Sequence, residues 1–260
     1  MTGVQTCALP IYAAESHHAA YLAVGVWHLF LVTGDRGFAL RMWPAVRAAT
    51  GWVLELQTPR GEVAWERDAA GRPGEFALLS GCSSILQGLR CALALADLAD
   101  EPQPDWELSA DLLGHVLARH REAFADKSRF SMDWYYPVLG GALRDGAGAE
   151  LLAAGWDTFV VPGLGVRCVS DQPWVTVAET CELVLSLDAC GQRDRAAEVF
   201  AAVRRPHVSS DITSSHVSAT VTHGSSLTHR TPRPVTTNVS QADASRDAAS
   251  APRSAPPSTG

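Results

Sequence analysis

A run of aromatic residues beside a carboxylate stands out in the segment SMDWYYP, where Asp133 precedes Trp134, Tyr135 and Tyr136. An apolar surrounding raises the pKa of a carboxyl group toward the range that a general acid needs, and flat rings offer surfaces for stacking a sugar or an isoprenoid. Asp133 is therefore our first candidate for catalysis. The structural alternative is that its side chain caps a turn before Pro137.

A second group of carboxylates follows in SDQPWVTVAETCEL, which contains Asp171, Trp174, Glu179 and Glu182. The two glutamates are three residues apart and share a face of a helix, whereas Asp171 comes just before that helix. Glycosidic hydrolysis uses two carboxyl groups about 5 to 10 Å apart across the bond. Alternatively, Asp171 caps the helix and the glutamates pair with an arginine such as Arg167. The catalytic candidates are Asp133, Asp171, Glu179 and Glu182.

Aromatic residues near these carboxylates are the candidates for substrate binding. They are Trp65, Trp134, Tyr135, Tyr136 and Trp174. Trp65 lies in a long connection between Glu62 and Glu66, which are either rim residues of a pocket or, as we favour, solvated surface. His17 and His18 could reach a pocket as proton carriers, although histidines in such a position usually have no role of that kind.

The cysteines between residues 82 and 190 contain no C-x-x-C pair and have no histidine at zinc-ligand spacing. This pattern favours free thiols in a reducing cytoplasm, so we expect a cytoplasmic protein. We predict no metal ligands and no cofactor. Ser83 and Ser84 follow Cys82 without a G-x-S-x-G context, which excludes a serine nucleophile of that type.

The charge and hydropathy of the chain exclude two classes of partner. The formal net charge is −7, and the basic residues form no footprint of the kind that binds nucleic acid. The apolar run 19–32 is interrupted by His28 and is shorter than the roughly 20 residues of a membrane span. We therefore expect no nucleic-acid partner and no membrane span, and the oligomeric state stays open.

Composition divides the chain into three parts. Residues 1–11, MTGVQTCALPI, match the translation of a common sequencing adapter and are excluded from the fold. Residues 204–260 are rich in Ser, Thr, Pro, His and Arg and lack Trp, Tyr, Phe and Lys, which predicts either a disordered tail or a frameshifted one. Residues 12–203 remain as one domain long enough for a proper core.

The elements that must position the candidate residues are helices. Apolar spacings of three and four residues predict helices over 15–33, 79–97, 105–121, 150–159, 175–189 and 192–203. Another has Trp43 and Pro44 in its first turn and ends near residue 57. Residues 58–75 read as a long connection with a small hairpin, and the segments DWYYPVLGG and VVPGLGVRCVSDQPW as irregular loops. The pattern predicts an all-α fold of about seven helices in hairpins.

Several segments together resemble an actinobacterial family usually labelled "prenyltransferase". They include LLSGCSSILQGLRCALALA, DKSRFSMDWYYPVLGG and RCVSDQPWVTVAETCELVLSLDA, and the likeness covers nearly all of residues 19–200. Members of the family are similar in outline to six-hairpin glycosidases and to terpene cyclase and protein prenyltransferase toroids. The resemblance implies a partial (α/α)6 toroid, an open arc whose pocket lies where inner helices and their loops meet.

Three functions fit these observations. The first is a carbohydrate-active, glycosidase-like enzyme that uses paired carboxylates in an aromatic cleft. The second is a prenyltransferase or terpenoid-handling protein; the D-x-D-D acid of cyclases and the zinc ligands of protein prenyltransferases are absent from the sequence. The third is a non-catalytic toroid that binds a glycan or a partner. We rank the first ahead, expect a glycan or isoprenoid as the small-molecule substrate, and expect an open arc to be inactive.

Overall fold

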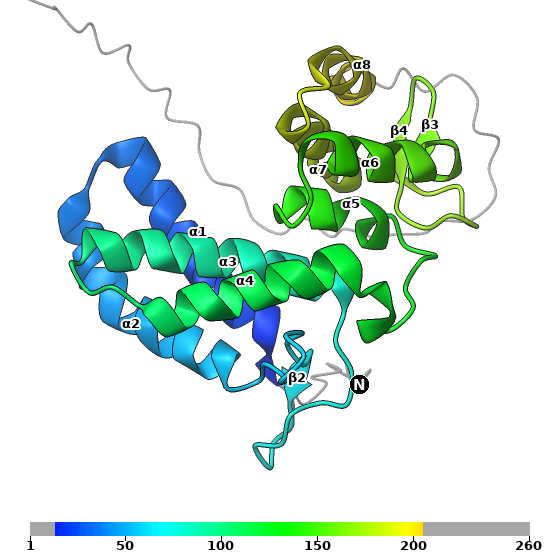
Figure 1. The fold of residues 1–260 in the computed structure, drawn as a ribbon. Coiled ribbons are helices and arrows are strands. Elements are labelled where there is room, and N and C mark those ends of the chain that lie inside the picture. Colours follow the sequence, from blue (N-terminus) through cyan, green and yellow to red (C-terminus); the bar gives the residue numbers. More distant parts are fainter. Residues whose placement is uncertain (1–13, 205–260) are drawn as a thin grey trace, which may run out of the picture. The chain divides into compact units, whose positions relative to one another are not determined.

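A computed structural model describes residues 14–204. The expected adapter segment 1–11 and, beyond Arg204, the expected tail lie outside this range. The described range is all-α, with eight α-helices and two small antiparallel sheets (Figure 1). The helices are α1 (Ser16–Thr33), α2 (Arg36–Leu54), α3 (Leu79–Leu98), α4 (Pro104–Arg119), α5 (Met132–Leu139), α6 (Asp145–Phe159), α7 (Val177–Ala189) and α8 (Arg193–Arg204), and a 3₁₀ turn, η1 (Arg121–Ala123), follows α4.

The helices pack in an alternating order. Helix α1 packs against α3, α3 against α5, and α5 against α7, so the odd-numbered helices form a continuous row. The even-numbered helices each pack against their odd-numbered neighbour: α2 and α4 on α3, α6 on α5, and α8 on α7. This is the order in which helical hairpins build an α/α toroid, and it confirms the expected fold class.

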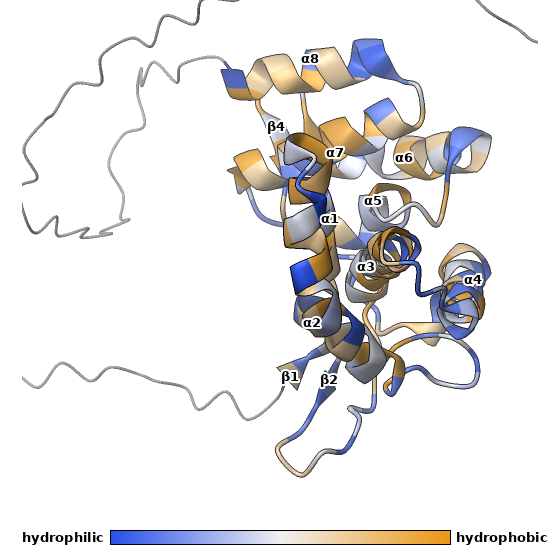
Figure 2. Cartoon of the chain, turned by 90° about the vertical axis from the view of Figure 1, so that its left-hand side faces the viewer, coloured by the Kyte–Doolittle hydropathy of each residue, from blue (hydrophilic) through white to orange (hydrophobic). Residues whose placement is uncertain are grey.

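The hydrophobic core is divided between two sets of helices. Residues of α1 to α4, such as Val46, Ile85 and Leu113, form two adjoining clusters. Residues of α5 to α8, such as Leu152 and Leu183, form another cluster of their own. In Figure 2 helix α7 is coloured mainly hydrophobic, in agreement with its burial against α5 and α8.

Helix α3 is central to the first set of helices, with side chains buried along its whole length. Within the described residues it is also the one helix long and apolar enough to cross a membrane, and 72% of that apolar stretch is buried inside the structure. Burial of this extent is what the core helix of a globular domain shows.

The beginning of the second helix differs from the prediction. Helix α1 ends as expected at Gly34, whose φ of 68° is left-handed and whose N–H bonds to the carbonyl of Phe30. Helix α2 then begins at Arg36 because the Asp35 side chain accepts a hydrogen bond from the N–H of Phe38. Pro44 lies inside this helix and not in its first turn, since the cap at Asp35 determines the start.

The other helix boundaries differ less. Helix α4 begins at Pro104, so Asp105 is a residue of its first turn and Gln103 occupies the capping position. Helix α6 begins at Asp145, five residues earlier than expected.

Two segments that we expected to be loops contain regular structure. The aromatic segment is helix α5, in which burial of Trp134, Tyr135 and Tyr136 outweighs the presence of Pro137 in its last turns. The segment after α6 contains a three-stranded antiparallel sheet of β3 (Val160–Val161), β4 (Gly165–Arg167) and β5 (Val175–Thr176), ordered β3-β4-β5.

The long connection after α2 contains the hairpin-like turns that the sequence predicts. Strand β2 (Glu66–Arg67) pairs antiparallel with β1 (Ala14–Glu15), and Glu15 lies opposite Glu66. A bridge between Gln57 and Val63 closes the first turn of the connection. The sheet therefore ties this connection to the start of α1.

Candidate active site

The first turns of helices α1, α3 and α5 come together around one cavity of about 280 Å³. Helix α1 contributes His17, α3 contributes Ser80, and α5 contributes Met132, each in its first turn. The residues that line the cavity are His17, His18, Tyr21, Trp65, Ser80, Gly81, Ser84, Met132 and Tyr136. Because helix N-termini carry partial positive charge, an electron-rich group is stabilised at such a place.

Glu182 of helix α7 is connected to this cavity through Tyr136 and is not itself one of the lining residues. The carboxylate accepts a hydrogen bond of 2.5 Å from the hydroxyl of Tyr135 and one of 3.1 Å from the hydroxyl of Tyr136. Burial raises the pKa of both tyrosines above their usual value, and the neighbouring charge of Glu182 raises it further. Both hydroxyls therefore stay protonated and hold the Glu182 carboxylate in a fixed orientation next to the cavity.

Glu179 lies one turn before Glu182 on the same face of α7, as the spacing predicts. Its carboxylate accepts a hydrogen bond from the Thr176 hydroxyl at the start of the helix, where a negative charge is favoured. Both glutamates are half-buried. Within residues 14–204 neither of them forms an ion pair, so the alternative of a salt bridge to Arg167 is wrong.

Trp65 is held against the beginning of α1. The N–H of Ser16 bonds to the Trp65 carbonyl at 2.9 Å, and the Ser16 hydroxyl bonds to the carbonyl of Ala64 at 2.8 Å. The His17 ring stacks on the indole, with the ring centroids 4.4 Å apart and the planes inclined by 17°. A Cβ at Gly81 would lie 2.8 Å from an indole carbon, so only glycine fits there. His17 therefore covers one face of the Trp65 indole ring, which the sequence indicated as a candidate stacking surface for a substrate.

The environment of His17 favours its neutral form. Burial lowers the pKa of the imidazole, and the neighbouring His18 lowers it further, while Glu15 acts in the opposite direction. The Nδ1 atoms of both histidines lie 3.6 Å from a carboxylate oxygen of Glu15. The candidate ligand atoms of Glu15, His17 and His18 all lie within 4.8 Å of one another, and in the described part of the chain this is the one group of three such side chains that is close enough to hold a metal ion.

Asp133 lies in a different cavity, of about 210 Å³, lined also by Arg121 and Asp126. The side chain is only 4% exposed, and one oxygen pairs with the Arg121 guanidinium at 2.5 Å. The other oxygen, Oδ1, has no hydrogen-bond partner. Burial raises the pKa of this carboxyl, and Arg121 acts in the opposite direction. The two cavities share no lining residue, so Asp133 is not brought to the cavity that Tyr136 lines.

The remaining aromatic and acidic candidates lie elsewhere. Trp134 is in the core, where its ring stacks on Phe159 and its indole N–H bonds to the Leu151 carbonyl at 2.8 Å. Asp171 and Trp174 are both exposed, at 58%. Asp171 accepts two hydrogen bonds from Arg129, which lower the pKa of its carboxyl, and it does not cap α7.

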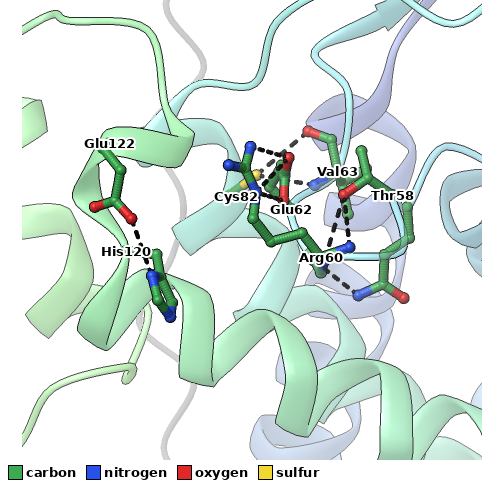
Figure 3. Close-up of polar contacts among 9 residues, drawn as sticks. Thr58, Arg60, Glu62, Val63, Cys82, His120 and Glu122 are labelled. Atoms are coloured by element: carbon green, nitrogen blue, oxygen red, sulfur yellow. Dashed lines mark hydrogen bonds and ion pairs between the residues drawn. The ribbon is translucent and has the colours of Figure 1, made fainter.

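Glu62 is buried and does not belong to a solvated surface, contrary to our expectation. The Arg60 guanidinium donates to both of its oxygens at 2.6 to 3.1 Å (Figure 3) and lowers the pKa of its carboxyl. The neighbouring Cys82 thiol contacts the backbone of Val63, and burial raises its pKa to about 12. Cys82 is thus an uncharged residue of the core.

Sequence reasoning missed five residues of the cavity. Tyr21 donates a hydrogen bond of 3.3 Å to the Ser84 hydroxyl, and Ser80, Gly81 and Met132 also line the cavity. The signal that could have found Ser80 and Ser84 is their spacing of four residues at the start of a helix that is otherwise apolar.

Comparison with known proteins bears on the chemistry of this site. No protein-family model matches the chain. Over 190 residues, 73% of this chain, it is 57% identical to the MMP endo-(1,4)-3-O-methyl-alpha-D-mannosidase of Mycolicibacterium hassiacum. That relative is a mannosidase. The match covers 53% of the relative, so the chain spans about half of its length. This likeness favours the carbohydrate-active interpretation over the prenyltransferase one.

Proposed function

We propose that this protein is an endo-acting glycosidase that cleaves 1,4 bonds between 3-O-methyl-α-D-mannose units. The support for this substrate is the identity of 57% to the mannosidase that is named for it. The observation that carries the proposal in the structure is that the Glu182 carboxylate is held by Tyr135 and by Tyr136, and that Tyr136 lines a cavity with aromatic walls.

In this proposal Glu182 is one of the two carboxyl groups that act on the glycosidic bond; Glu179 lies on the same face of α7 and so does not face it across the bond. A glycosidase needs one carboxyl group to protonate the leaving oxygen and another to activate water or attack the sugar. Tyr136 lines the cavity, and its hydroxyl donates a hydrogen bond to the Glu182 carboxylate. Met132 and the edge of Trp65 supply apolar surface for a methyl ether, which has no hydroxyl proton to donate.

A non-catalytic glycan-binding role is the second candidate. It is favoured by one specific observation, that both oxygens of Glu182 already accept hydrogen bonds from within the protein. A carboxylate whose oxygens accept hydrogen bonds from the protein can still accept one from a sugar hydroxyl, and so it can orient a sugar without transferring a proton.

The test uses the 260-residue chain and two oligosaccharides of α-1,4-linked mannose, one 3-O-methylated and one unmethylated. Calorimetry measures binding, and chromatography of the products measures cleavage. We expect the methylated compound to bind more tightly and to be cleaved internally, a result that would contradict the expectation from the sequence that an open arc is inactive. Glu182→Gln should abolish cleavage, and Glu107→Gln, an exposed change on α4, should leave it unchanged.

The outcomes separate the two candidates. Binding of the methylated compound without cleavage by the unaltered chain would support the glycan-binding role and reject the hydrolase. A folded chain that binds neither oligosaccharide would reject both.

A further inference from the structure

A third cavity, of about 370 Å³, lies beside helices α1 and α3 and the loop after α5. It has no residue in common with the candidate active site. Its lining residues are Val24, Trp27, His28, Leu31, Gln87, Arg90, Cys91 and Arg144. Two arginines, an amide and an imidazole thus face the same space as an indole ring.

The two arginines are held close together by the end of helix α5. Arg90 donates from Nη1 to the Gly140 carbonyl at 3.2 Å, and Arg144 donates from Nη1 to the Val138 carbonyl. Both guanidinium groups converge on Gly141, whose φ is 85°. A Cβ at this position would lie 2.1 Å from Arg90 Nη1 and 2.8 Å from Arg144 Nη2. Any residue other than glycine would therefore collide with the two guanidinium groups.

The positive charges of this pair are not neutralised by a carboxylate of the described chain. Among residues 14–204, no acidic side chain lies within ion-pair distance of Arg90 or Arg144. Burial lowers the pKa of Arg90, the charge of Arg144 lowers it further, and only the more distant Asp111 opposes them. Like charges at short range repel one another, and the carbonyl dipoles at the end of α5 offset only part of this cost.

We propose that this cavity binds a small organic molecule that carries an oxyanion, either a phosphate monoester or a carboxylate. Arg90 and Arg144 contact its oxygens, because the planar guanidinium group matches the geometry of both anions. Gln87 and His28 lie where they can donate further hydrogen bonds, and the Trp27 ring contacts the carbon part of the ligand. The proposal does not depend on the proposed function.

The experiment measures binding to the full chain by calorimetry with mannose 6-phosphate, mannuronate, inorganic phosphate and neutral mannose. The first two probes distinguish a phosphate from a carboxylate on the same carbon skeleton. We expect one of them to bind, mannose not to bind, and the affinity to fall as salt is raised. Arg144→Gln and Arg90→Gln should each weaken binding at least about tenfold, since each removes charge-assisted hydrogen bonds.

Two further variants make the result specific. Arg72→Gln removes an exposed arginine that pairs with Asp68 on a distant loop, and it should leave the affinity unchanged. Arg144→Lys keeps the charge and should retain part of the binding. Unaltered chain that binds none of the three anions, or an Arg144→Gln protein that is folded by circular dichroism and binds as tightly as the unaltered chain, would overturn the proposal.

Discussion

Glu182 is the residue on which the candidate site depends most directly. Its two oxygens are engaged by hydroxyl groups from a neighbouring helix, and Tyr135, which donates the shorter bond, is fully buried. A carboxylate fixed in this way keeps one orientation, whereas a carboxylate paired with a flexible arginine at the surface does not.

Removing one of these hydroxyls should have a measurable cost. Tyr135→Phe keeps the buried ring but leaves one oxygen of Glu182 without its donor, so we expect a loss of about 1.5 to 3 kcal/mol in the free energy of unfolding. Urea denaturation followed by circular dichroism measures it. The matched control is Tyr21→Phe, which removes the hydroxyl of a residue that is 44% exposed and whose bond to Ser84 is long, at 3.3 Å, so it should change stability by less than about 0.5 kcal/mol. Equal effects of the two changes would contradict the proposed anchoring.

The pair of Glu62 and Arg60 predicts a dependence of stability on pH. The folded pKa of Glu62 is lowered mainly by its hydrogen bond with Arg60. Its contribution is therefore fully present above the unfolded pKa of about 4.3 and is lost as the pH falls through the lower folded pKa. Glu62→Gln should destabilise the protein by about 1 kcal/mol at pH 7.

The measurement is a series of urea denaturations between pH 2 and pH 7. The difference between the unaltered chain and Glu62→Gln should shrink on the acid side of pH 4.3. A difference that stays constant over this range would show that the carboxylate charge does not contribute. Glu75→Gln, a change at an exposed residue of the same connection, serves as the control.

At the scale of elements, the odd-numbered helices approach one another through small residues. A Cβ at Gly88 of α3 would lie 2.7 Å from the backbone carbonyl oxygen of Ala20 on α1. Because the obstacle is backbone, the two helices would have to separate to admit a methyl group. This close approach is what brings His17 of α1 and Ser80 of α3 to the same cavity.

Gly88→Ala should destabilise the protein by about 1 to 3 kcal/mol, as overpacking does. Gly114→Ala on α4 is the matched control, since its Cβ would meet only side-chain carbons at 3.8 Å or more. There the gain in helix propensity should stabilise by about 0.5 to 1 kcal/mol. The midpoints of thermal unfolding of both variants check the prediction. A neutral Gly88→Ala would mean that α1 and α3 are not in backbone contact.

The sequence predicts the long helices well because their apolar residues recur regularly. Helices α1, α3, α7 and α8 lie within two residues of the expected ranges. The helical state of residues 132–139 could not be predicted, since Pro137 and the glycines after it are typical of a loop and the burial that outweighs them is tertiary.

The candidate site is less predictable than the fold. The spacing of Glu179 and Glu182 correctly places them on one face of α7. Nothing in local spacing indicates that Asp133 faces Arg121 while Tyr136, three residues later, faces His17 and Trp65. That division depends on which helices pack on each side of α5, a property of the assembled chain.

At the scale of the described molecule, the candidate active site lies between two separately packed cores. Trp65 and Ser80 come from the part of the chain whose side chains pack around α3, whereas Tyr136 comes from the cluster of α5 to α8. Contact across this boundary includes Gly140, at which a Cβ would lie 2.2 Å from the Ser83 carbonyl oxygen. Neither core by itself determines the width of the cavity.

Because the cavity lies between two cores, the residues that determine the stability of the fold differ from those that determine the width of the cavity. Most of the buried apolar surface lies within the two cores, whereas the width of the cavity depends on the spacing between them. Substitutions at the boundary, near Ser83 and Gly140, can therefore change which ligands are accommodated while the cores keep the chain folded. Such an arrangement lets one scaffold diversify its substrates through few mutations, without first acquiring compensating changes elsewhere.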